Sequence, residues 1–179
     1  MILTVREAVE RGIVGENELE LSARLTAVES AVRAYTHNHF QNRFVRFAAE
    51  SQDSRLTAKA PSPALPYFQV GDTVEITQSK VNDGLYVVTC TGDGYLKVDG
   101  VLFPAKHNLV TKVVYPEDVK AGALNLLRWE MENRDKVGVK SETISRHSVT
   151  YYDQDAGNTA MGYPISLMGF LTPYRKARF

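Results

Sequence analysis

Apolar residues recur at helical spacing in the first part of the chain. Between residues 16 and 36 they are separated by four or three positions, which places them on one stripe of a helix. The stripe consists of Leu21, Leu25, Val28, Val32 and Tyr35. We expect it to be a helix packing face. Four alanines in the same segment would let another helix approach closely, within the protomer or from a neighbouring copy: Ala23, Ala27, Ala31 and Ala34.

The pattern changes after about residue 43, where short apolar runs alternate with turn sequences. Pro61, Pro63 and Pro66 exclude a helix around residues 60–67. Strand-like runs follow at residues 70–78, 84–91, 95–98 and 109–115. The turns between them are Asn82-Asp83-Gly84, Gly92-Asp93-Gly94 and Asp99-Gly100. Several short strands joined by tight turns predict a small antiparallel barrel or curled sheet.

The helical period returns at Pro116, a residue that is favourable at a helix start. The apolar face beyond it consists of Val119, Ala123, Leu126, Leu127 and Met131. The order of helices, strands and helices predicts an α+β protein with one part inserted in the other. We expect a small helical bundle formed by residues 1–43 and 116–179, and an antiparallel, barrel-like β subdomain inserted at residues 44–115.

Charge and composition exclude several classes of partner and binding site. The 179 residues include 21 Lys plus Arg and 21 Asp plus Glu, so no overall field draws the chain to nucleic acid or to an acidic membrane. The single cysteine, Cys90, excludes an internal disulfide and a multi-cysteine zinc site. No apolar stretch is long enough to span a membrane, and charge interrupts the first residues, so we expect a soluble, non-exported protein. The last 24 residues carry a local positive charge, because they include three basic residues and no acidic ones.

Motifs that carry catalytic chemistry are missing from the sequence. It contains no phosphate-binding, dinucleotide-binding, zinc-hydrolase or serine-nucleophile motif. The sharpest metal candidate is the pair His37 and His39, which would need His107 or His147 as further ligands. Histidines at a helix end are more often partners of its terminal carbonyl groups. We therefore expect that the chain is not an enzyme and that it binds no cofactor. A hydrolase or metal enzyme is the third hypothesis.

The second hypothesis is a small-barrel module on a helical base that binds nucleic acid or protein. Residues 71–76 are typical of the first strand of such a barrel. Tyr86 and Tyr95, with Lys80 and Lys97, would supply stacking and charge to a nucleic acid. This set of aromatic and basic residues is thin, which favours a protein contact or a spacer role.

Loose patterns at the two ends of the chain carry a family resemblance. The N-terminal pattern is LTAVESAVRAYT at residues 25–36. The C-terminal patterns are Pro116 with VKAGALNLLRW at 119–129, GVKSETIS at 138–145 leading to SVTYY at 148–152, and LTPYRK at 171–176. Together they resemble the head–tail connector family of long-tailed bacteriophages, the small adaptors that join the portal ring to the stopper or tail.

The resemblance implies a helical core that forms a closed homo-oligomeric ring, usually of twelve copies, around the DNA channel. The implied partners are the portal protein, the stopper or tail-completion protein, and genomic DNA that passes without sequence-specific contacts. No membrane is implied. The expected location is the head–tail junction of the virion, with assembly in the host cytoplasm. The resemblance assigns no role to the β insertion.

Three groups of candidate functional residues follow. The resemblance implies a portal-docking tail of Pro173, Tyr174, Arg175, Lys176, Arg178 and Phe179. It also implies a loop or hairpin that reaches a neighbour or the channel, with Lys140, Ser141, Glu142, Arg146 and His147. The helical period predicts a packing face with Leu21, Leu25, Val28, Val32, Leu127 and Met131.

Overall fold

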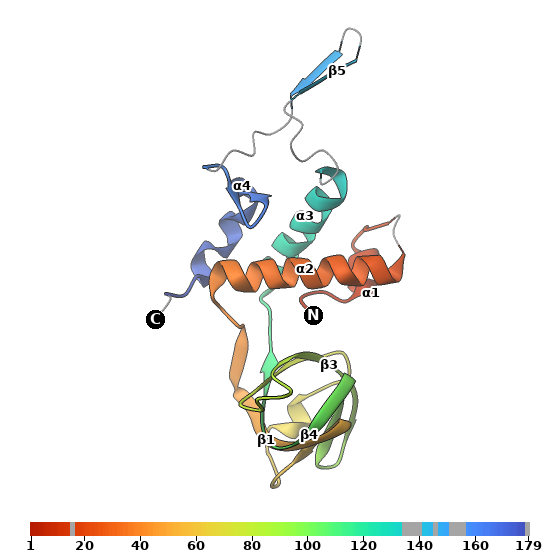
Figure 1. Ribbon diagram of the computed structural model, residues 1–179, viewed down its shortest axis with the longest axis vertical. Helices are drawn as coiled ribbons and strands as arrows, with labels where there is room; N and C mark the ends of the chain where they lie inside the picture. The colour runs from red at the N-terminus through yellow and green to blue at the C-terminus, as the bar shows by residue number, and fades with distance from the viewer. Residues whose placement is uncertain (15–16, 134–140, 145–146, 151–156, 178–179) are drawn as a thin grey trace. The chain divides into compact units, whose positions relative to one another are not determined.

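The computed structural model describes residues 1–14, 17–133, 141–144, 147–150 and 157–177. Contacts divide the chain into two compact units, whose elements are labelled in Figure 1. The sheet unit consists of Met1–Thr4 and His39–Tyr115, and the helical unit consists of Val5–Asn38 and Pro116–Phe179. Each unit is therefore built from two separate pieces of chain.

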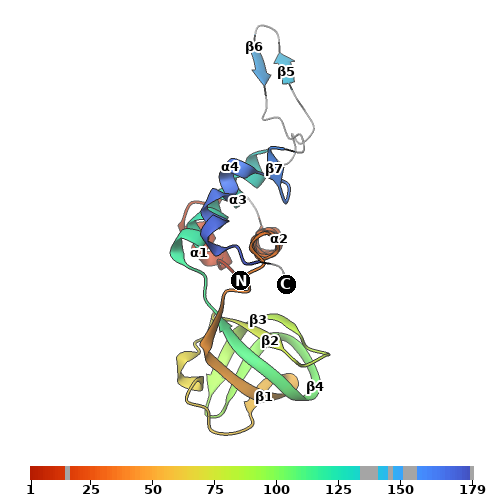
Figure 2. The same cartoon turned by 90° about the vertical axis from the view of Figure 1, so that its left-hand side faces the viewer.

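The sheet unit contains four antiparallel strands: β1 (Gln41–Ala58), β2 (Thr73–Thr77), β3 (Gly84–Gly92) and β4 (Tyr95–Val113). Their order is β1-β4-β2-β3, and β4 also pairs with β3. The first part of β4 lies beside β3 and its last part lies beside β2, so the sheet is curled (Figure 2). The short 3-10 helix η1 (Leu65–Tyr67) occupies the proline-rich connection between β1 and β2.

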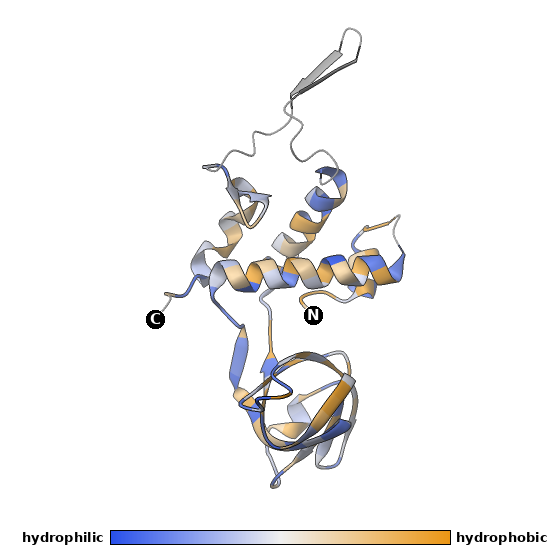
Figure 3. Cartoon of the chain, in the orientation of Figure 1, coloured by the Kyte–Doolittle hydropathy of each residue, from blue (hydrophilic) through white to orange (hydrophobic). Residues whose placement is uncertain are grey.

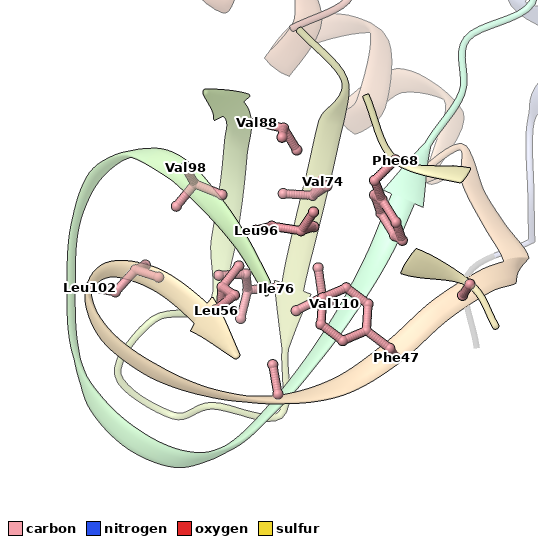
Figure 4. Packing of buried hydrophobic residues seen from close by; sticks show 12 residues of the cluster. Phe47, Leu56, Phe68, Val74, Ile76, Val88, Leu96, Val98, Leu102 and Val110 are labelled. Atoms are coloured by element: carbon pink, nitrogen blue, oxygen red, sulfur yellow. The ribbon is translucent and has the colours of Figure 1, made fainter. Parts of the chain in front are cut away.

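One apolar core fills the inside of the curled sheet. Its buried members are Phe47, Ala49, Leu56, Ala64, Phe68, Val74, Ile76, Val88, Leu96, Val98, Leu102 and Val110 (Figure 4). Phe47 and Phe68 make an edge contact with ring centroids 5.5 Å apart. In β1, Phe47 and Ala49 are buried while Ala48 and Glu50 are exposed, the alternation of a strand with one covered face.

A buried polar network lies where the register between β1 and β4 shifts. Asn82 is 2% exposed; its Nδ2 donates to Ser51 Oγ at 2.9 Å and to the Phe103 carbonyl at 2.8 Å. Its Oδ1 accepts the Phe103 N–H at 2.8 Å. Asn108 Nδ2 donates to the Ala49 carbonyl and to Ser51 Oγ, both at 3.2 Å. These side chains satisfy backbone groups at the point where the regular strand ladder is interrupted.

The helical unit contains α1 (Val5–Glu10), α2 (Glu18–Thr36), α3 (Glu117–Asn133) and α4 (Ile165–Met168). A hairpin of β5 (Ser141–Ile144) and β6 (His147–Thr150) follows α3. Two short strands, β7 (Thr159–Ala160) and β8 (Tyr163–Pro164), precede α4, and the 3-10 helix η3 (Gly169–Tyr174) follows it. The side chain of Asn17 caps α2 by accepting the Glu20 N–H at 2.8 Å.

Apolar and polar residues mix along α2 and α3 (Figure 3), and the apolar ones hold the helical unit together. The buried residues of the two helices that are at most 2% exposed include Leu21, Leu25, Val28, Val32, Leu126 and Leu127. Gly122 of α3 lies against Phe170 of η3, because a Cβ at this position would come within 2.3 Å of the ring. The missing side chain therefore lets η3 pack closely on α3.

The expected fold is right in its α+β class and wrong in its architecture. The small helical bundle with an inserted barrel-like subdomain is not what the described residues form: they contain a four-stranded antiparallel sheet and four α-helices. Two of these, α1 and α4, have only six and four residues. The described chain after α3 forms strand pairs, α4 and a 3-10 helix, with no further long helix. Asp99-Gly100 is also not a turn between strands: β4 continues through it, with Gly100 at φ +92°.

Replacing Asn82 by alanine should destabilise the sheet unit. The change removes the side-chain partner of the partly buried Phe103 N–H and a buried hydrogen bond to Ser51. We expect the free energy of unfolding, measured by urea denaturation, to fall by about 2 kcal/mol. Gln69→Ala, at an exposed position of the same unit, should change it by less than about 0.5 kcal/mol. Equal effects of the two substitutions would contradict the role of the network.

Candidate functional site

The C-terminal segment, of which the structure describes residues 172–177, is hydrogen-bonded to the end of α2. The backbone N–H of Lys176 donates to the carbonyl of Thr36, the last residue of α2, at 2.7 Å. Carbonyl groups in the last turn of a helix have no partner inside the helix, so the returning chain satisfies one of them. The guanidinium carbon of Arg175 lies 5.0 Å from the ring centroid of Tyr35, within the range of a cation–π contact.

Tyr174 links the end of α2 to the start of α3. Its carbonyl accepts a hydrogen bond from Asn38 Nδ2 at 3.2 Å. Its hydroxyl donates to the carboxylate of Asp118, with the two oxygens at 2.9 and 2.8 Å. This hydrogen bond is the main cause that raises the pKa of Tyr174, and desolvation and the charge of Asp118 act in the same direction. Tyr174 therefore joins two segments that the sheet unit separates in sequence.

The remaining predicted tail residues differ in their surroundings. Pro173, Arg175 and Lys176 are exposed, whereas Tyr174 is half-buried. Arg178 and Phe179 lie outside the described residues. The described part of the tail is thus a fixed backbone that presents two positively charged side chains.

Three of the five predicted inter-subunit or channel residues belong to the hairpin after α3. Ser141 and Glu142 belong to β5 and His147 belongs to β6. The strands are antiparallel, with Ser141 opposite Thr150. Lys140 and Arg146 lie outside the described residues.

The predicted packing face of α2 is turned into the helical unit. Leu21, Leu25, Val28, Val32 and, on α3, Leu127 are buried there, and Met131 is half-buried. Residues two positions away from a buried stripe lie on the other side of a helix. On that side of α2, Ala23, Ala27 and Ala34 are exposed. The helix thus keeps a surface of small side chains that the unit itself does not cover.

The histidines considered as metal ligands have the following surroundings. His37 ends α2 in a left-handed conformation with φ +50°. His39 Nδ1 lies 2.7 Å from Glu75 Oε1, and His107 Nδ1 lies 3.1 Å from Lys59 Nζ. Among the residues that the structure describes, no group of three or more His, Cys, Asp or Glu side chains is arranged to hold a metal ion. His147 belongs to β6.

Tyr86 and Tyr95, the aromatic residues of the nucleic-acid hypothesis, contact other residues of the sheet unit. The guanidinium carbon of Arg55 lies 3.7 Å from the ring centroid of Tyr95, so one face of that ring is covered. Tyr86 is half-buried and its hydroxyl donates to the Asn82 carbonyl at 3.2 Å. Lys80 and Lys97 are exposed. One face of the Tyr95 ring and the hydroxyl of Tyr86 are thus in contact with other residues of the unit.

Three residues that fix the C-terminal segment are not found by sequence reasoning. Thr36 appears there only as the last residue of the N-terminal pattern, and Asn38 and Asp118 are not singled out. Their contacts with the C-terminal segment join distant parts of the chain. No local pattern signals such contacts.

Comparison with known proteins adds no relative. No model of a known protein family matches the chain. A search of curated proteins finds no significant match either. In the described part of the chain, no helix is both long and apolar enough to cross a membrane.

The contact with Asp118 should give Tyr174 a high pKa. A raised pKa means that the stabilisation is fully present below the pKa of an unfolded tyrosine and is lost as the pH rises through the higher folded value. The phenolate absorbance of the native chain minus that of Tyr174→Phe should therefore titrate with a midpoint above 10.0. The same difference measured in an Asp118→Asn background should have a lower midpoint. An unchanged midpoint would show that Asp118 does not hold the hydroxyl proton.

Proposed function

We propose that the chain is a structural adaptor of a tailed-phage virion, which forms a ring between the portal and the stopper or tail around the DNA channel. The order of elements in the helical unit carries this proposal: α2, α3, the hairpin β5–β6 and the C-terminal segment follow one another. In the resembled family these positions hold a helical core, a loop or hairpin toward neighbours or the channel, and a portal-docking end. The adaptor acts through contacts and not through catalysis.

A ring requires two different surfaces on each copy, because every copy touches one neighbour on each side. The buried stripe of α2 cannot serve, since the helical unit uses it. The opposite side of α2, with exposed Ala23, Ala27 and Ala34, allows close approach of a neighbour. The hairpin β5–β6 supplies the second surface or faces the DNA.

The C-terminal segment supplies the portal contact. Its backbone is held at Tyr174 and Lys176, so docking needs little further ordering of this part of the chain. Its exposed Arg175 and Lys176 offer positive charge in a chain whose net charge is zero. Charged side chains at the rim of an interface mainly set orientation and the rate of association.

Reversing the tail charges with Arg175→Glu plus Lys176→Glu should weaken portal attachment at least about tenfold, because two favourable charges become repulsive. The fold should persist, since both side chains are exposed and Lys176 contacts Thr36 through its backbone. Attachment is measured by cosedimentation with tailless, DNA-filled capsids of the phage that encodes the chain.

The matched control is Lys97→Glu plus Lys106→Glu, which changes the net charge equally at two exposed positions of the sheet unit. It should attach like the native chain. Native-like attachment of the tail variant would refute the tail assignment. Failure of the native chain to attach at all would refute the adaptor function.

A further inference from the structure

Phe44 is an exposed aromatic residue on a bulge of the sheet unit. It is 98% exposed. Asn42 pairs with Lys112 while Arg46 pairs with Thr111, so residues 43–45 are extra residues on β1 that have no partner in β4. Phe44 donates its backbone N–H to Asn42 Oδ1 at 3.2 Å. Large aromatic side chains that become buried at a protein interface contribute much of its binding energy.

The same unit carries a hollow of about 380 Å³ with a mixed polar and apolar lining. Pro61, Ser62, Leu65, Pro66 and Phe68 line it from the connection after β1, and residues 91–94 line it from the end of β3 and the turn that follows. Phe68 is only 3% exposed, and the proline rings limit how far the lining can move. The volume lies within the range of about 300–1,000 Å³ that holds ligands in proteins. It is therefore large enough for one aromatic side chain.

Charge at the two places is complementary. Arg43, next to Phe44, is exposed and positive. Asp93, which belongs to the lining of the hollow, is exposed and negative. Arginine is enriched among the residues that dominate binding energy at interfaces, and an arginine–carboxylate pair adds charge-assisted hydrogen bonds.

We propose that the partner of this surface is a second copy of the chain: Phe44 of one copy enters the hollow of the next, and Arg43 pairs with Asp93 beside it. Because the bulge and the hollow are different patches, the contact can repeat from copy to copy. This inference adds a specific contact to the proposed ring. It rests on the proposed function for the closure of the repeated contacts into a ring. One side chain and one ion pair bury little area, so a single contact is weak and gains strength from repetition in the assembly.

Crosslinking between two different variants tests the contact. Arg43→Cys and Asp93→Cys are each made in a full chain that also carries Cys90→Ser, and one of the two proteins carries an affinity tag. When they are mixed with a short bismaleimide, residue 43 of one copy should link to residue 93 of the other. We expect the yield of this mixed dimer to exceed severalfold that of a control mixture in which Lys106→Cys replaces Arg43→Cys.

A Phe44→Ser change in the Arg43→Cys protein should reduce the mixed dimer to the level of the control. Phe44 is almost fully exposed, so circular dichroism should show an unchanged fold. A yield equal to the Lys106 control, or one that Phe44→Ser does not reduce, would overturn the inference. The proposed function is judged separately: a ring on the portal without the 43–93 link would refute this contact alone, and the link without attachment to capsids would refute the adaptor alone.

Discussion

Each unit of this protein is built from two pieces of chain that are separated in sequence. The rest of the structure depends on the contacts that hold these two pieces together. In the sheet unit, the Thr73 hydroxyl at the start of β2 donates to the Met1 carbonyl at 3.1 Å, which joins Met1–Thr4 to His39–Tyr115. In the helical unit, Tyr174 binds Asn38 just beyond α2 and Asp118 in the first turn of α3. Hydrogen bonds thus join the two pieces of chain within each unit. One unit can therefore interrupt the other in sequence without leaving either open.

Closure of the helical unit also decides which parts of the C-terminal segment are available to a partner. The Tyr174 side chain and the Lys176 backbone belong to the fold, while the side chains of Arg175 and Lys176 remain exposed. In the sheet unit, the network around Asn82 satisfies buried backbone groups, while the bulge at Phe44 projects into solvent. Both units combine a fixed backbone with exposed anchor side chains. That arrangement suits a protein that works by docking to neighbours.

The sequence predicts the two long helices and parts of the sheet, but not the architecture or the irregular contacts. The period of α2 identifies the stripe from Leu21 to Val32 because burial on one side of a helix leaves a repeat in the sequence. The runs at 70–78 and 84–91 contain or nearly match β2 and β3. The division of β4 at Gly100 is wrong because a glycine can bend a strand as well as end it. The contacts of Tyr174, and the bulge that exposes Phe44, arise from long-range pairing and register, which have no local signature.

We propose that this chain forms a ring at the portal of a tailed phage. Electron microscopy of the portal vertex, after purified protein is mixed with tailless, DNA-filled capsids of that phage, tests this proposal. A ring-forming adaptor should add a ring of density beneath the portal that contains many copies of the chain. A bare vertex in the presence of folded protein would show that the chain does not form this ring.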